Sequence, residues 1–245
     1  MKEFYQQTKE ELLQQFHVTG HGLSGEEAKK RLVEYGENVL EEGKRKSTLQ
    51  VFFEQFCDLL VVILIIAALI SMVSGNVEST IVIIAVIVLN AILGTVQHAK
   101  AEKSLDSLKS LSSPNAKVLR DGQKIEIPSA QVVPGDILYL EAGDLVVADG
   151  RVLENYSLQV NESSLTGEST NVDKSDGLIH DDCALADRAN MVYSSGLVTY
   201  GRAVVLVTST GMGTEIGKIA ALMNATKEKK TPLQISLDQF GSRLA

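Results

Sequence analysis

Two long apolar runs, separated by a short polar break, constrain the fold of this 245-residue chain more than any other feature. Between residues 59 and 73 only Ser71 is not apolar, and a second run covers residues 79–97. A membrane-spanning helix needs about 20 apolar residues. The first run reaches that length if it includes the aromatic residues from Phe52 to Phe56, which suit a membrane interface. We therefore expect a hairpin of two transmembrane helices, at about 52–74 and 78–96. The alternative is a pair of buried helices in a soluble protein.

The charges around the two runs predict their orientation. The break carries Glu78 and no Lys or Arg, whereas the outer ends carry basic residues: Lys44, Arg45 and Lys46 before the hairpin, and Lys100 and Lys103 after it. By the positive-inside rule, both ends face the cytoplasm. We expect an integral protein of the cell membrane, with the lipid bilayer as a partner. Asn90, inside the second run, indicates either an ion path or a hydrogen bond between helices.

Composition excludes several other classes of protein. The formal net charge is -8, which argues against a nucleic-acid partner. The two cysteines, Cys57 and Cys183, do not form a zinc-binding pattern with the four scattered histidines, so we expect no metal site in this chain. The N-terminus is charged and lacks the apolar core of a signal peptide.

Helical patterns flank the hairpin on both sides. Residues 1–46 predict two short cytoplasmic helices, Tyr5–Gln15 and Ser24–Tyr35, and Ser24 with Glu27 fits a capping box. Residues 97–113 predict an amphipathic stalk helix. The apolar residues that can dock the first two helices on a neighbour are Leu12, Leu13, Phe16, Leu32 and Val33.

Residues 114–223 change to short strands and turns. Residues 116–127 predict a hairpin with Asp121-Gly122 at its turn. Further strands are expected in residues 132–154, a last hairpin in residues 190–210, and a helix from Gly213 to Met223. Such a pattern fits any small barrel or sandwich. Residues 224–245 read as a polar linker.

The loop between Val160 and Lys174 is the strongest candidate for chemistry. Its centre is Thr166-Gly167-Glu168-Ser169. Glycine permits a tight turn and a close approach of the backbone to a ligand. A glutamate at such a turn can orient a water molecule or accept its proton. The alternative is an ordinary polar turn with a solvated glutamate.

Several motifs, in this order around a membrane hairpin, resemble the actuator domain of P-type cation-transporting ATPases. They are Val133-Pro134-Gly135-Asp136, Gly143-Asp144, Ala148-Asp149-Gly150, Leu165 to Ser169, and Thr214 to Ile219. The resemblance covers the whole chain. Glu54-Gln55-Phe56 and Asp58-Leu59-Leu60 resemble the start of the first membrane helix of calcium pumps, so Glu54 and Asp58 are candidates for the path by which the ion enters.

The resemblance implies an α+β membrane protein, in which a transmembrane helical hairpin joins a small all-β, distorted jelly-roll-like actuator domain with accessory N-terminal helices. Such pumps move a cation through an aspartyl-phosphate intermediate formed from ATP and Mg²⁺. Glu168 matches the glutamate that positions the hydrolytic water. Thr166 and Gly167 would let the loop approach the phosphate, and Ser169 would hold the turn. The resemblance gives Glu162 no role at the phosphate. A change of Glu162 is therefore expected to serve as a neutral control for a change of Glu168.

The resemblance also implies missing parts. The chain has no Asp-Lys-Thr-Gly-Thr phosphorylation sequence. We expect it to be the N-terminal part of a pump whose phosphorylation, nucleotide-binding and later transmembrane parts are its partners, together with the transported cation. It should bind no ATP or Mg²⁺ and be inactive alone. Cys57 replaces a carboxylate of the best-known calcium pumps, so a sodium, potassium, proton or magnesium pump stays open, as does a non-enzymatic membrane-anchored adaptor.

Overall fold

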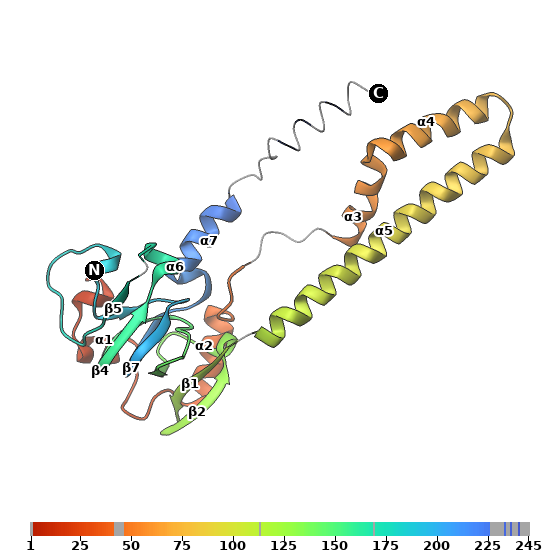
Figure 1. The fold of residues 1–245 in the computed structure, drawn as a ribbon. Coiled ribbons are helices and arrows are strands. Elements are labelled where there is room, and N and C mark those ends of the chain that lie inside the picture. Colours follow the sequence, from red (N-terminus) through yellow and green to blue (C-terminus); the bar gives the residue numbers. More distant parts are fainter. Residues whose placement is uncertain are drawn as a thin grey trace. The chain divides into compact units, whose positions relative to one another are not determined.

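The computed structural model describes residues 2–41, 47–112, 114–168 and 170–225, and three single positions, Leu233, Ser236 and Phe240 (Figure 1). The chain divides into two compact units. Residues 1–42 and 114–245 form one of them, here called the sheet unit. Residues 43–113 form the other, here called the hairpin unit.

The sheet unit contains one seven-stranded sheet in which every pair of neighbouring strands is antiparallel. The strand order is β2-β1-β3-β7-β4-β5, and β6 pairs with β4 outside this path. The strands are β1 Asn115–Arg120, β2 Gln123–Pro128, β3 Ile137–Glu141, β4 Asp149–Asn161, β5 Asn171–Asp173, β6 Met191–Val192 and β7 Leu197–Ser209. The longest two, β4 and β7, lie side by side at the centre. The jelly-roll form stays a prediction.

The predicted hairpin at residues 116–127 is confirmed, because β1 pairs with β2 and Arg120 lies opposite Gln123. Asp121 and Gly122 both have positive φ, 51° and 74°, as a tight two-residue hairpin turn requires. The predicted last hairpin is wrong, since β6 and β7 both pair with β4. Alternation of apolar residues indicates which side of a strand is buried, but it does not identify the neighbouring strand.

Both faces of the central strands are buried. On one face, Val152 and Val205 belong to a large aliphatic cluster that includes Val118 and Leu138. Their chain neighbours Leu153 and Leu206 point to the other face, because successive strand residues alternate. There they pack against the N-terminal helices through Leu12, Val18, Leu23 and Ala28. The N-terminal helices therefore cover one side of the sheet.

The N-terminal segment forms η1 Phe4–Gln6, α1 Lys9–Gln15 and α2 Gly25–Tyr35. The predicted helix Tyr5–Gln15 is wrong in extent, because Thr8 interrupts it. The Thr8 hydroxyl accepts the Glu11 N–H at 3.2 Å, and the Glu11 carboxylate accepts the Thr8 N–H at 2.8 Å. This reciprocal capping box starts a new helix.

Only half of the predicted capping box at Ser24 is present. The Ser24 hydroxyl accepts the Glu27 N–H at 3.2 Å, but the Glu27 carboxylate accepts Arg31 Nε at 3.0 Å instead. Of the five predicted docking residues, Leu12 is buried and three others pack beside it. Val33 was a wrong prediction, because it is 89% exposed.

The remaining short elements of the sheet unit are η3 Ser129–Gln131, α6 Ser163–Thr166, η4 Leu185–Asp187, η5 Gly211–Gly213 and α7 Glu215–Ala225. The last of these confirms the helix expected near residues 213–223. The predicted linker 224–245 lies almost entirely outside the described residues.

The hairpin unit contains α3 Thr48–Glu54, η2 Gln55–Cys57, α4 Leu59–Val73 and α5 Val77–Ser112. Within α5, Val77–Leu105 is long and apolar enough to cross a membrane. The helix expected at 52–74 is not continuous, because Asp58 has extended backbone, with φ -66° and ψ 136°. A bend of 66° separates Thr48–Cys57 from Val61–Val73, which together make a second candidate span if the bent pair is one span.

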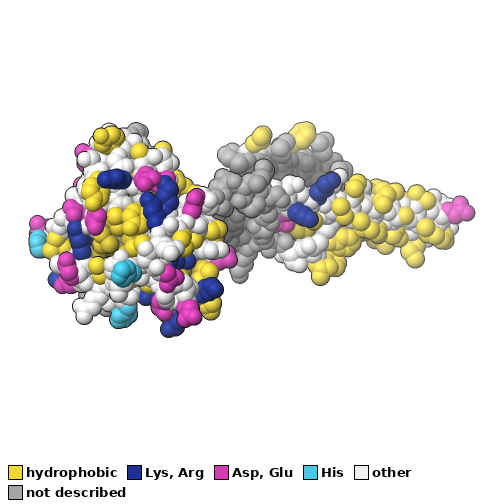
Figure 2. All heavy atoms as spheres, turned by 90° about the horizontal axis from the view of Figure 1, so that it is seen from below, with side chains coloured by type: hydrophobic (Ala, Val, Ile, Leu, Met, Phe, Trp, Pro, Cys, Tyr) yellow, Lys and Arg dark blue, Asp and Glu magenta, His cyan; other side chains and the backbone are white. Residues whose placement is uncertain are grey.

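The outer surface of the hairpin unit is strongly apolar. Many hydrophobic side chains lie on the part of it visible in Figure 2, between basic side chains near one end and an acidic side chain at the tip. Val73 is 89% exposed and Leu89 is 66% exposed within the structure. A core helix of a soluble protein would bury such residues, so this surface favours contact with lipid. The two-span topology with cytoplasmic ends stays a prediction.

Candidate functional site

The candidate loop connects two neighbouring strands of the sheet. β4 ends at Asn161 and β5 begins at Asn171, and these two residues lie opposite each other in the ladder. Just after β4, the chain turns into the short helix α6, where the Asn161 side chain accepts the Ser163 N–H at 3.2 Å. The loop is therefore presented from the end of a central strand.

Gly167 ends α6 in the left-handed conformation, with φ 78° and ψ -3°. Its N–H donates to the carbonyl of Ser163 at 3.0 Å. A Cβ at this position would meet nothing within 4 Å, so backbone strain, rather than collision, favours glycine here. The glycine reverses the chain immediately before the candidate glutamate.

Glu168 follows the turn and is exposed. Its backbone N–H donates to the Thr166 hydroxyl at 3.3 Å, and that hydroxyl donates to the Glu162 carbonyl at 3.1 Å. The structure thus brings Thr166, Gly167 and Glu168 together in one turn, whereas Ser169 lies outside the described residues. An exposed carboxylate in a fixed turn can bind water or accept its proton when a second reactant is brought to it.

A buried ion pair lies at the base of this loop. Lys174 Nζ contacts Glu162 Oε2 at 2.7 Å, and the two side chains are 0% and 1% exposed. Burial raises the pKa of the Glu162 carboxyl and lowers the pKa of the Lys174 ammonium group, while their mutual attraction opposes both effects. Sequence reasoning missed this pair, and because the Glu162 side chain is buried and ion-paired, Glu162 is not a suitable neutral control. The available signal was one charged residue at each end of the loop.

The loop also rests on an aromatic cluster. Leu165 of α6 packs against the buried residues Tyr5, Met191 and Tyr193. The Lys174 ammonium lies 5.7 Å from the centre of the Tyr193 ring. Because Tyr5 belongs to the N-terminal segment, residues far apart in the sequence support one loop.

The two candidate residues for ion access lie in the hairpin unit. Asp58 lines a hollow together with Gln55, Asn90 and Gln97. Glu54 is absent from the lining of this hollow and accepts a hydrogen bond from Gln50 at 3.5 Å. Among the described residues no group of three or more His, Cys, Asp or Glu side chains could hold a metal ion. A role for Glu54 and Asp58 in ion access stays a prediction.

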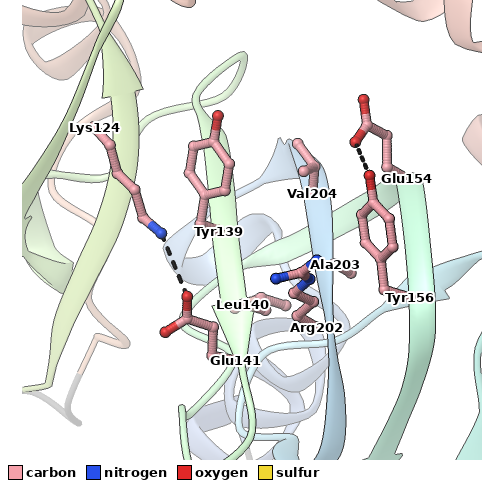
Figure 3. A pocket seen from close by; sticks show the side chains of 9 residues that line it. All are labelled: Lys124, Tyr139, Leu140, Glu141, Glu154, Tyr156, Arg202, Ala203 and Val204. Carbon is pink, nitrogen blue, oxygen red and sulfur yellow. Dashed lines mark hydrogen bonds and ion pairs between the residues drawn. The ribbon is translucent and has the colours of Figure 1, made fainter.

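Another hollow, of about 260 Å³, lies on the sheet and is lined by nine residues (Figure 3). Lys124 lies 4.5 Å from the centre of the Tyr139 ring and contacts Glu141 at 3.4 Å. Arg202 similarly lies 4.9 Å from the centre of the Tyr156 ring. None of the lining residues belongs to residues 162–174. Both cations already have partners, so we assign no function to this hollow.

Comparison with known protein families gives two matches. Residues 110–224, which contain all seven strands and the candidate loop, match the family described as P-type ATPase actuator domain. The part of the chain that holds the sheet and the candidate loop is therefore similar to a P-type ATPase actuator domain. Residues 4–71 match a second family, described as Cation transporter/ATPase, N-terminus.

Curated relatives match almost the whole chain. A calcium-transporting ATPase of Listeria monocytogenes is 45% identical over 242 residues, which are 99% of this chain and 28% of that protein. A calcium-transporting ATPase of Bacillus subtilis is 45% identical over 224 residues, 91% of this chain and 25% of that protein. A probable cation-transporting ATPase F of Mycobacterium tuberculosis is 41% identical, with the same coverage. The chain therefore spans about a quarter of the length of these relatives.

Proposed function

We propose that this chain is the N-terminal part of an ATP-driven calcium pump, and that Glu168 acts in the dephosphorylation of its aspartyl-phosphate intermediate. The observation that carries the proposal is the exposed Glu168 directly after the left-handed Gly167, within the region that matches the actuator domain. In this proposal, both ends of the hairpin face the cytoplasm.

Hydrolysis of an acylphosphate requires a water molecule that is oriented and loses a proton as it attacks. The Glu168 carboxylate would accept that proton, and Thr166 would hold the turn. Ser169 would support the same turn. The phosphorylated aspartate, ATP and Mg²⁺ would belong to other parts of the pump. The turn's exposure supports this role, because the carboxylate must reach a group that these residues do not supply.

The names of the Listeria and Bacillus relatives favour calcium as the cation. Cys57, in place of a carboxylate, favours the second candidate, a pump for another cation. The two are distinguished in the complete pump, where phosphoenzyme formation should require Ca²⁺ and should not proceed with Na⁺, K⁺ or Mg²⁺ alone. Phosphorylation without Ca²⁺ would remove the calcium assignment.

The role of Glu168 can be tested in a chimera in which this chain replaces the matching 242 residues of the Listeria relative. Loss of general-base catalysis typically costs about 10²–10⁴-fold, so Glu168→Gln should slow phosphoenzyme decay by that order after an ATP chase, while phosphorylation survives. Glu126→Gln, on the exposed edge strand β2, is the matched control and should decay normally. Normal decay in Glu168→Gln would leave the loop with a structural role only.

A further inference from the structure

The strand β5, which follows the candidate loop, is held by few contacts. β5 has three residues, lies at the edge of the sheet and contains no buried residue. The chain becomes fixed at the next residue, Lys174. Its N–H donates to the Leu158 carbonyl at 2.9 Å, and its own carbonyl accepts Asn155 Nδ2 at 2.6 Å. Lys174 is therefore the anchor at which the loop returns to β4.

Glu162 is the corresponding anchor at the start of the loop. Its carbonyl accepts the N–H groups of Leu165 and Thr166 at 2.9 and 3.0 Å, and the Thr166 hydroxyl at 3.1 Å. Its carboxylate reaches Lys174. The contacts thus run without a gap from Lys174 through Glu162 and Thr166 to the backbone of Glu168.

Stability alone does not explain this pair. Removing two charges from water is costly, and an apolar pair of similar volume is often as stable or more stable. An ion pair does, however, fix the distance and direction between its two side chains. In this loop, it fixes both ends of the segment that carries Glu168.

We propose that Lys174 and Glu162 are positioning residues, which hold the Thr166–Glu168 turn in the geometry that dephosphorylation requires. This inference rests on the proposed function of Glu168. The pair itself does not touch the reacting atoms and acts through Thr166.

The test uses the chimeric pump with a neutral pair, Lys174→Met combined with Glu162→Gln. Both charges are removed together, so no buried charge is left uncompensated. We expect phosphoenzyme decay to slow by about 10- to 100-fold, the scale of a small misplacement of a catalytic group, with unchanged phosphoenzyme formation. The control is Arg120→Met with Asp136→Asn, which removes another ion pair, between the half-buried Arg120 of β1 and the buried Asp136 before β3, and should leave decay unchanged.

A combination with Glu168→Gln separates positioning from general stability. If the pair acts through Glu168, the neutral pair should slow decay no further once Glu168 is changed, because effects within one unit are not additive. Multiplication of the two effects would overturn the proposal. Normal decay in Glu168→Gln would instead remove the proposed function. Slow decay in Glu168→Gln with normal decay in the neutral pair would remove the positioning role alone.

A second variant and a direct measurement cover the case in which the neutral pair does not fold in the pump. Glu162→Asp keeps both charges but shortens the side chain by one methylene, and it should also slow decay; normal decay would contradict the proposal. In the present chain, Glu162→Asp should speed amide exchange at Leu165, Thr166 and Gly167 by about tenfold without affecting β7, since local opening is confined to the loop. Unchanged exchange in the loop would overturn the proposal.

Discussion

The carboxylate of Asp149 accepts the backbone N–H of Glu215 at 2.7 Å and thereby caps α7 at its first residue. Its other oxygen accepts the N–H of Ser194 at 2.8 Å. Asp149 is only 4% exposed. One side chain thus joins the start of β4 to a loop and a helix that come much later in the sequence, and it does so with a carboxylate that burial disfavours.

Burial raises the pKa of Asp149 to about 6, whereas the ordinary value is 3.8. The folded state therefore binds the proton more tightly than the unfolded state between these values. The ionised carboxylate costs stability above pH 6, and this cost disappears as the pH falls from about 6 toward 4. The difference between the two pKa values corresponds to a cost on the order of 3 kcal/mol in the free energy of unfolding.

We expect this cost to be absent in Asp149→Asn. The free energy of unfolding of the wild type, compared with that of the variant, should therefore rise as the pH falls from 7 to 5. Denaturant unfolding of the detergent-solubilised chain, at a series of pH values, measures the free energy of unfolding of the wild type and of the variant. A difference that stays constant across this range would show that Asp149 does not titrate there.

Arg31 should make a large contribution to the stability of the sheet unit. Its guanidinium donates to the carbonyls of Pro134 at 2.8 Å and Phe16 at 2.7 Å, and it also pairs with Glu27. Arg31→Ala leaves these partners without a donor, and we expect a loss of about 2–4 kcal/mol in unfolding free energy. The exposed neighbour Lys30 is the control, and Lys30→Ala should cost less than about 0.5 kcal/mol. Similar losses in the two variants would contradict this role.

The hairpin topology predicts opposite accessibility for Asn76 and Ser112. Single cysteines are introduced at these positions after Cys57 and Cys183 are replaced by serine. A membrane-impermeant thiol reagent should label the position-76 variant from outside the cell and the position-112 variant only from the cytoplasmic side. Labelling of both positions from the same side would exclude the hairpin.

The isolated chain should not hydrolyse ATP. Its sequence contains neither the Asp-Lys-Thr-Gly-Thr sequence nor a Walker-type phosphate loop, so it offers no aspartate of the family motif to phosphorylate. Phosphate release by the purified chain should equal that of the Glu168→Gln variant and of buffer. Steady turnover that Glu168→Gln abolishes would show that the chain has its own nucleotide site.

Local signals in the sequence predicted local structure well. Asp121-Gly122 specifies its own turn, so the β1–β2 hairpin follows from residues that are adjacent in the chain. The break at Thr8 had a local signal, the Thr8–Glu11 box, which was overlooked beside the longer helical pattern. The partner of β6 had no such signal, because strand pairing depends on distant residues.

The same distinction applies to the candidate site. Glu168 and its turn could be predicted because Thr166-Gly167-Glu168 is one continuous motif. The buried Glu162–Lys174 pair had only a weak signal, one charged residue near each end of the loop, because charged residues near a polar loop are normally solvated. Only the pairing of β4 with β5, which brings the two ends of the loop together, shows that they meet.

The sheet unit is interrupted in the sequence by the hairpin unit, and this arrangement sets the order of biogenesis. The hydrogen bond from Arg31 to the Pro134 carbonyl joins residues 103 positions apart in the sequence. The hydrogen bond from the Asn190 side chain to the Tyr5 carbonyl joins residues 185 positions apart. During synthesis from the N-terminus, the hairpin leaves the ribosome before the strands that cover Leu12 and Leu23 exist. The apolar side of the N-terminal helices therefore stays uncovered until those strands have been made.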